Sequence, residues 1–239
     1  LENLNLNENN FIQNINKFGI LAKCYDQIEN FDKAFLNFKV NNNLVSKYHG
    51  KNIDENIYIK YVMQRIEFFQ DFKINRWKQY PFKKELLNPI FLVGFPRSGT
   101  TLLDTIFRTN SDVEVIEEKP ILKNFLIKLE KETKNDFNQL DNLSQRFIEE
   151  MKHFYFEERK QYQKDKKAKI VIDKLPLNII HIAEILRFFP NAKFIFALRH
   201  PYDSVLSCFM QQFELNPAMK NFLTLESSAH LYDLVMKLW

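Results

Sequence analysis

The sequence predicts an α/β fold in which a parallel sheet carries helices on both faces, preceded by a small α-helical segment. Within the first 85 residues, apolar positions recur with helical spacing over 11–45 and 56–72. After residue 86, short apolar runs alternate with helical stretches, which is typical of strands joined by crossover helices in a parallel sheet. With 239 residues, 45% of them hydrophobic, the chain can bury such a core. We therefore expect two domains, at 1–85 and 86–239.

The helical segment begins with a pattern that extends from Phe11 to about Val45 and is broken at 28–30. This pattern predicts two short helices in a hairpin. Its aromatic and small residues resemble the final unit of a tetratricopeptide repeat array, at Phe18, Leu21, Tyr25, Ala34 and Phe38. A lone repeat cannot bury its own apolar face, so the resemblance implies further repeats before Leu1 and a protein partner. The alternative is an ordinary amphipathic hairpin.

The remaining elements follow from apolar runs and their boundaries. A further helix is expected at 56–72, and a linker at 77–88. Short apolar runs predict strands, at 90–93, 113–116, 170–172 and 193–198. Helical spacing predicts the helices between and after them, at 100–108, 121–131, 141–163, 177–189 and 202–213.

Composition excludes several classes of function. Lys+Arg 34 against Asp+Glu 30 gives 34 − 30 = +4. The basic stretch 159–169 contains Asp165 and directly follows Glu157 and Glu158, so we expect no nucleic-acid partner. The two cysteines, Cys24 and Cys208, suit neither a disulfide framework nor a metal site. No apolar run approaches the roughly 18 residues of a membrane span. We expect a cytoplasmic protein without a metal, and a targeting segment before Leu1 stays an open alternative.

Residues 94–101 form the most specific motif of the chain. They have the Gly-x4-Gly spacing of a phosphate-binding loop and stand between a predicted buried strand and a helix N-terminus. Backbone N–H groups and the helix dipole favour an anion there. Thr100 replaces the lysine of nucleoside triphosphatases, and the cation is instead Arg97. A magnesium-dependent triphosphatase is therefore disfavoured, while a generic strand-to-helix turn is the structural alternative.

The stretch 95–102 resembles the 5′-phosphosulfate-binding loop of sulfotransferases that use 3′-phosphoadenosine-5′-phosphosulfate (PAPS). A second stretch, 189–207, resembles the strand, arginine and serine with which that family holds the 3′-phosphate. The resemblance implies a P-loop-like sulfotransferase fold and a set of donor-binding residues, namely Pro96, Arg97, Ser98, Gly99, Thr100, Thr101, Arg199 and Ser207. For Arg199, a structural ion pair is the alternative.

The resemblance also implies a catalytic set. The spacing from Arg97 to Glu118 is similar to that of protein-tyrosine sulfotransferases and bacterial repeat-linked sulfotransferases, in which the corresponding glutamate is the catalytic base. Lys174 matches the family's lysine at the sulfuryl group. The predicted catalytic residues are thus Arg97, Glu118 and Lys174. The alternatives are that Glu117 and Glu118 complement a helix dipole, and that Lys174 is a surface cation.

By this resemblance the chain transfers a sulfuryl group from PAPS to a hydroxyl acceptor by in-line displacement, without a metal. The acceptor is a peptide tyrosine, a glycan or a small molecule, and the sequence does not distinguish them. Two alternatives stay open: a repeat-based binding protein with an inactive transferase domain, and a nucleotide-dependent phosphotransferase. The resemblance covers Pro89 to Trp239 and ends before the family's last donor-binding segment, so we expect a domain truncated at its C-terminus.

Overall fold

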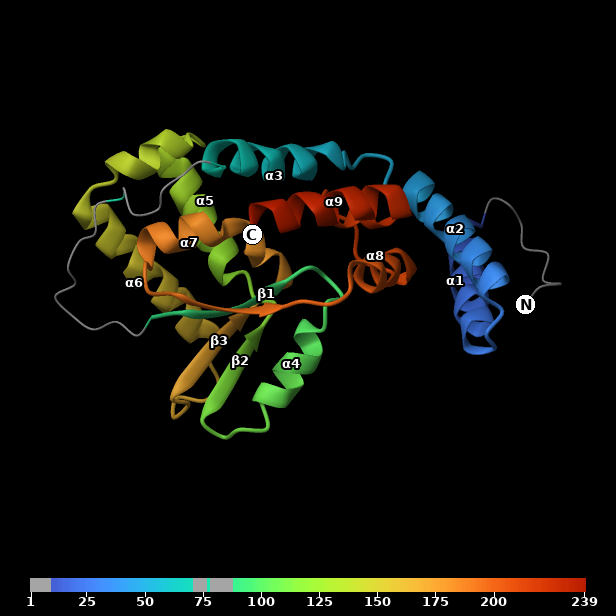
Figure 1. Ribbon diagram of the computed structural model, residues 1–239, viewed down its shortest axis with the longest axis horizontal. Coiled ribbons are helices and arrows are strands. Elements are labelled where there is room, and N and C mark those ends of the chain that lie inside the picture. Colours follow the sequence, from blue (N-terminus) through green and yellow to red (C-terminus); the bar gives the residue numbers. More distant parts are fainter. Residues whose placement is uncertain (1–9, 71–76, 78–87) are drawn as a thin grey trace. The chain divides into compact units, whose positions relative to one another are not determined.

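The computed structural model describes residues 10–70, 77 and 88–239 (Figure 1). The chain forms two compact units. The first, here the helical unit, comprises the residues up to Gln64 together with Pro201–Met236, and the second, the sheet unit, comprises Arg65–His200 with Lys237–Trp239. The predicted domain boundary near residue 85 and most of the predicted linker lie outside the described residues.

Four parallel strands form the centre of the sheet unit. They are β1 (Ile90–Gly94), β2 (Val113–Glu117), β3 (Ile170–Lys174) and β4 (Lys193–Ala197), in the order β2-β3-β1-β4. All three pairings are parallel, so the carboxyl ends of the strands meet at one edge of the sheet. At this edge Gly94 is paired with Ala197, and Glu117 with Lys174. The predicted parallel sheet is confirmed, with each strand within two residues of its expected bounds.

Helices cover both faces of this sheet (Figure 1). On one face, Leu92 belongs to a core cluster against which Leu103 and Phe107 of α4 (Thr100–Phe107) pack. On the other, the neighbouring Phe91 packs on Tyr155 of α6 (Gln145–Tyr162), with ring centroids 5.8 Å apart. Consecutive strand residues point to opposite faces, so α4 and α6 lie on opposite sides of β1. The remaining elements of the unit are α5 (Ile121–Thr133), η2 (Phe137–Asn142), η3 (Pro176–His181) and α7 (Ile182–Phe188).

Two expected helices are divided: the one over 177–189 into η3 and α7, and the one over 141–163 into η2 and α6. The sequence predicts a continuous helix over 141–163, but η2 ends at Asn142 and α6 begins at Gln145. Ser144 causes the new start, because its backbone is extended and its hydroxyl accepts a hydrogen bond from the amide of Phe147 at 3.2 Å. This is the geometry of an N-cap, which the apolar periodicity alone does not reveal.

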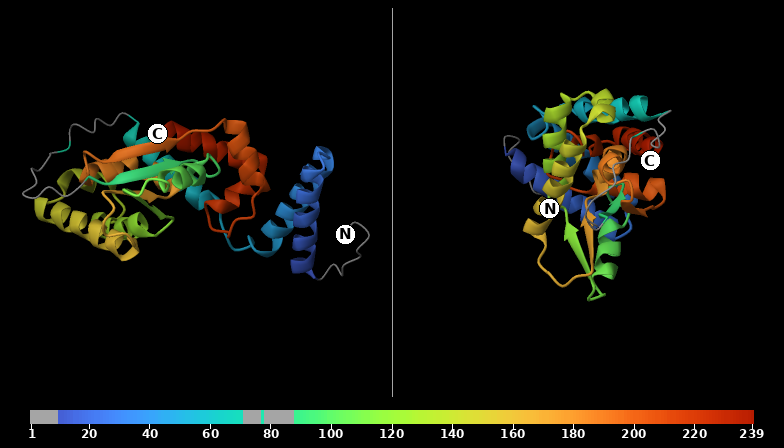
Figure 2. Two further views of the ribbon diagram at one scale, coloured as in Figure 1. Left: turned by 90° about the horizontal axis from the view of Figure 1, so that it is seen from below. Right: turned by 90° about the vertical axis from the view of Figure 1, so that its left-hand side faces the viewer.

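The helical unit contains the predicted hairpin, formed by α1 (Phe11–Gln27) and α2 (Phe31–Tyr48), which lie side by side (Figures 1 and 2). Ala22, Ala34 and Phe38 form a buried cluster with Phe209. The small alanines let the two helices approach closely. Its identity as a tetratricopeptide repeat stays a prediction. The other elements are α3 (Asn56–Phe69), α8 (Pro201–Met210), η4 (Met219–Phe222) and α9 (Leu225–Leu238). The last residues of α3 and of α9 belong to the sheet unit. Within the described ranges, no helix has both the length and the apolarity of a membrane span.

Candidate active site

The loop between β1 and α4 closes tightly because two of its positions are glycine. Gly99 has φ +99°, a left-handed conformation that strains residues with a Cβ atom, and it is the N-cap of α4. At Gly94 a Cβ atom would lie 2.6 Å from the Ser98 hydroxyl oxygen and 2.7 Å from the carbonyl oxygen of Ala197. Arg97 between them also has positive φ, at 67°. The loop therefore folds back against β4 at the carboxyl edge of the sheet.

This loop presents unpaired donors to a ligand. No side chain caps α4, and the first intrahelical bond runs from the amide of Leu103 to the carbonyl of Gly99, at 3.0 Å. The preceding amides, including those of Thr100 and Thr101, have no partner within the helix. The Ser98 hydroxyl is buried, with no hydrogen-bond partner in the described part of the chain. Together with the helix dipole, these groups fit a phosphate or sulfate anion.

Within the sheet unit, Arg199 of the second predicted motif contacts the loop of the first. Arg199 follows β4 and donates from its guanidinium to the backbone carbonyl of Arg97 at 3.4 Å, across 102 positions of sequence. Both arginine side chains are exposed at the carboxyl edge of the sheet. Guanidinium groups bind phosphate oxygens through charge-assisted hydrogen bonds. Two cations of this kind therefore lie at this loop, Arg97 within it and Arg199 beside it.

At the same edge, two carboxylates share one buried lysine. Lys174 ends β3, its side chain is 0% exposed, and its ammonium lies 2.8 Å from Glu117 Oε1 and 3.0 Å from Glu118 Oε1. Consecutive strand residues normally point to opposite faces. Glu118 follows the strand with φ 49°, and its amide donates to the Lys174 carbonyl at 2.7 Å. This left-handed turn brings both carboxylates to one ammonium, so Lys174 is not a surface cation.

The shared contact shifts the pKa values of Lys174 and Glu117. Burial disfavours the charged form of Lys174, but hydrogen bonds to the two carboxylates outweigh it and raise the pKa of the ammonium above its ordinary value. The hydrogen bond from Lys174 lowers the pKa of Glu117, against a smaller effect of burial. Lys174 is therefore a cation and Glu117 an anion at neutral pH.

Two further residues belong to this cluster, and our sequence analysis did not identify them. Arg108, just after α4, forms a close ion pair with the buried Asp104 and donates to the carbonyl of Val115 at 2.8 Å. Its guanidinium also lies 4.0 Å from Glu117 Oε2. The sequence signal that could have identified this pair is its spacing, because an aspartate and an arginine four positions apart can pair along a helix. Only the structure shows that this pair reaches the end of β2.

Asp173 was also missed, although it precedes Lys174 directly. Its side chain is 1% exposed and accepts a hydrogen bond from the Tyr155 hydroxyl at 3.1 Å, while its Oδ1 is buried without a partner among the described residues. Burial raises the pKa of this carboxyl to about 7, although the hydrogen bond from Tyr155 and the charge of Arg159 oppose the shift. A carboxyl of this kind is a candidate for pH-dependent behaviour.

The other predicted site residues are distributed over both units. In the sheet unit, Pro96 and Thr100 are buried, and Thr101 is exposed on the first turn of α4. Ser207 lies half-buried on α8, which belongs to the helical unit. The shared role of Ser207 and Arg199 at a 3′-phosphate thus stays a prediction. In the part of the chain that the structure describes, no three His, Cys, Asp or Glu side chains gather as metal ligands.

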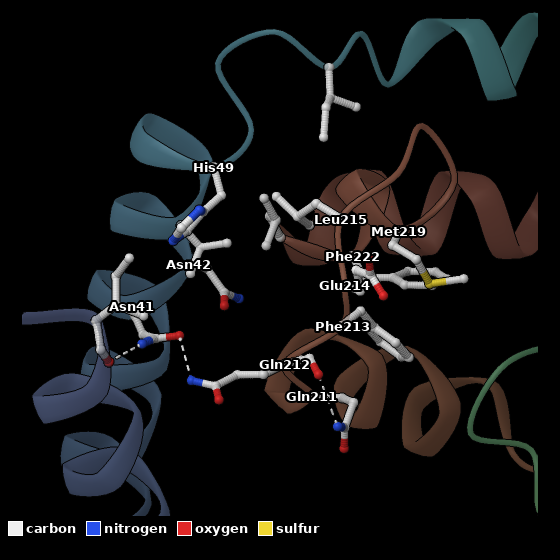
Figure 3. A pocket seen from close by; sticks show the side chains of 14 residues that line it. Asn41, Asn42, His49, Gln211, Gln212, Phe213, Glu214, Leu215, Met219 and Phe222 are labelled. Carbon is white, nitrogen blue, oxygen red and sulfur yellow. Dashed lines mark hydrogen bonds between the residues drawn. The ribbon is translucent and has the colours of Figure 1, made fainter. Parts of the chain in front are cut away.

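The helical unit contains a separate cavity of about 420 Å³ (Figure 3). Side chains of α1, α2 and the segment after α8 line it, and none of them is a predicted site residue. Its carboxamides bind the protein itself: Asn41 donates to the carbonyl of Ile15 at 2.5 Å, and Asn42 to that of Phe209 at 2.9 Å. The first contact joins the two helices of the hairpin and the second holds the hairpin against α8, so the cavity walls serve the packing of the unit.

Comparison with known proteins agrees with this geometry. Residues 89–239 match the profile described as "Sulfotransferase family". This range contains the loop, Lys174 and both glutamates. The chain is also 30% identical over 208 residues to an uncharacterized protein of Aquifex aeolicus (strain VF5). That match covers 81% of this chain and 26% of the relative, so the chain spans about a quarter of the relative's length.

Proposed function

Because this chain belongs to the sulfotransferase family, we propose that it transfers a sulfuryl group from PAPS to a hydroxyl acceptor. The observation that supports this proposal is the arrangement at one edge of the sheet. An uncapped helix N-terminus with a buried, unpartnered Ser98 hydroxyl follows β1, and the Lys174 ammonium with two carboxylates lies at the ends of β3 and β2. The helix N-terminus suits binding of an anion, and the lysine with its two carboxylates suits proton transfer.

The donor-binding residues divide by the part of PAPS that they would hold. Residues 96–101 would surround the 5′-phosphosulfate, with the Thr100 and Thr101 amides and the Ser98 hydroxyl as donors, and Arg97 would supply positive charge. Arg199 and Ser207 would hold the 3′-phosphate, as the family resemblance implies. When bound, PAPS supplies a sulfuryl group attached to a phosphate, which is the leaving group.

Glu118 is the proposed base. Its side chain is 54% exposed, so an acceptor hydroxyl can reach it from solvent, and it would take the hydroxyl proton as the oxygen attacks sulfur. Lys174 would neutralise the negative charge that grows on the departing phosphate oxygen. Arg97 would stabilise the sulfonate oxygens during transfer. The α1–α2 hairpin is a candidate surface for a protein partner.

Transfer of ³⁵S from labelled PAPS tests the proposal. The acceptors are a tyrosine peptide, a glycan and a phenol, and the variants are Glu118→Gln and the matched surface control Glu150→Gln. Loss of a general base lowers turnover by roughly 10²–10⁴, so Glu118→Gln should lose that much and the control almost nothing. Bound donor without transfer would favour the binding-module alternative. Phosphoryl transfer from ATP under the same conditions would favour a phosphotransferase.

A further inference from the structure

The two carboxylates that share Lys174 have different surroundings. Glu117 has a cation near each oxygen, because Oε1 accepts from Lys174 at 2.8 Å and Oε2 forms a long ion pair with Arg108, at 4.0 Å. Arg108 is itself fixed by Asp104 and by the carbonyl of Val115. The carboxylate of Glu118, in contrast, contacts only Lys174 among the described residues, at 3.0 Å. Glu117 thus lies near two cations and Glu118 near one.

This difference matters when an anion enters the site. A lysine ammonium is a compact charge with three donors, and a bound anion competes with the carboxylates for it. Lys174 can give up its contact with Glu118 at lower cost, because Glu117 is held in place by the Arg108 pair. The pKa of Glu117 also lies below its ordinary value, which makes it a weak base.

We propose that Glu117 is a positioning residue that retains Lys174 at the sheet edge, so that Glu118 is released to act as the base when the donor binds. Arg108 and Asp104 support Glu117 in this role. Two adjacent carboxylates then have two functions: one keeps the cation, and the other accepts the proton. This inference rests on the proposed function, since it assigns the base to Glu118.

Steady-state kinetics with labelled PAPS test the proposal through three variants: Glu117→Gln, Arg108→Gln and the double variant. Glu117→Gln should lower kcat about tenfold or more while KM for PAPS changes less than about threefold. Arg108→Gln should lower kcat in the same direction by less. Because both residues act through one contact, the double variant should be no slower than Glu117→Gln alone. The exposed pair Arg146–Glu150 on α6 provides matched controls, Arg146→Gln and Glu150→Gln.

A wild-type kcat in Glu117→Gln, or fully additive losses in the double variant, would overturn the positioning role. An inactive Glu117→Gln beside an active Glu118→Gln would reverse the two roles and overturn it as well. Circular dichroism separates these outcomes from misfolding, and the conservative Arg108→Lys should recover part of the activity lost in Arg108→Gln.

A second measurement needs no acceptor. The exchange of the Lys174 ammonium protons with water, followed by ¹⁵N NMR and assigned with Lys174→Arg, should become severalfold faster in Glu117→Gln and stay unchanged in Glu150→Gln. Unchanged exchange in Glu117→Gln would overturn the proposal even in an inactive protein. Absence of sulfate transfer in the wild type, with altered exchange in the variant, would instead reject the proposed function.

Discussion

Lys174 and Glu118 are joined through both side chain and main chain. The ammonium lies 3.0 Å from the carboxylate, and the Glu118 amide donates to the Lys174 carbonyl at 2.7 Å. The left-handed backbone of Glu118, with φ 49°, makes both contacts compatible. Strained backbone of this kind costs on the order of 1 kcal/mol and persists where surrounding contacts determine it. A cation and a candidate base are thereby held together at the edge of the sheet where the loop after β1 also begins.

The first prediction concerns the cation itself. Lys174→Met should lower donor affinity and, to a greater extent, turnover. It removes the charge that we propose to lie opposite the leaving phosphate, and it leaves two carboxylates without their shared partner. We expect a loss of turnover of at least about 10², in the range of a lost transition-state donor. Steady-state kinetics check this against Lys160→Met, a lysine of an exposed pair with Glu157 at 2.6 Å. Equal activity of the two variants would contradict the role of Lys174.

The second prediction concerns the loop. Arg97→Ala should weaken binding of adenosine 3′,5′-bisphosphate by about tenfold or more, since charge-assisted contacts to an anion contribute about 1.5–3 kcal/mol. The unfolding midpoint should change little, because the Arg97 side chain is exposed. Calorimetry and thermal melting measure the two quantities on the same sample. Unchanged affinity would show that Arg97 serves only the turn.

The third prediction is a pH dependence of stability that originates at Asp173. Its pKa is raised by burial from the usual value of 3.8 to about 7. The folded state therefore binds a proton that the unfolded state loses, and stability falls as pH rises from about 4 to about 7. Asp173→Asn cannot ionise but still accepts from Tyr155. It should be more stable than the wild type at pH 8, by roughly 2–4 kcal/mol, and similar to it at pH 4.

Urea unfolding at several pH values checks this, with Glu150→Gln as the exposed control. Wild type and control should lose stability together as pH rises, and the Asp173→Asn curve should be flatter. Parallel curves for all three proteins would show that the buried carboxyl does not titrate in this range.

The sheet and its loop were predictable because their signals are local. The apolar run before Gly94 and the loop after it lie within a dozen positions, and the structure places them as β1, loop and α4. The break between η2 and α6 was not predicted, because the cap at Ser144 interrupts an apolar pattern that continues across it. Local periodicity thus predicted the type of each element more accurately than its first and last residues.

The site was only partly predictable for a different reason. The contact of Glu117 with Lys174 joins positions 57 apart and depends on the register of β2 and β3. The role of Arg108 depends on how α4 packs beside β2, and the burial of Asp173 depends on α6. These relationships form only when the sheet assembles. Sequence motifs therefore identified the residues that we propose to bind or react, while the residues that orient them required the structure.

The central claim is that the site binds a PAPS-type nucleotide, and a comparison of adenosine 3′,5′-bisphosphate with AMP tests it most directly. Arg199 and Ser207 are the residues proposed to hold the 3′-phosphate, and Arg199 already contacts the loop through the Arg97 carbonyl at 3.4 Å. Calorimetry should show the bisphosphate binding more than about tenfold more tightly than AMP, and Arg199→Ala should remove most of that preference with little change for AMP. Equal affinities for the two nucleotides in the folded wild type would contradict the account.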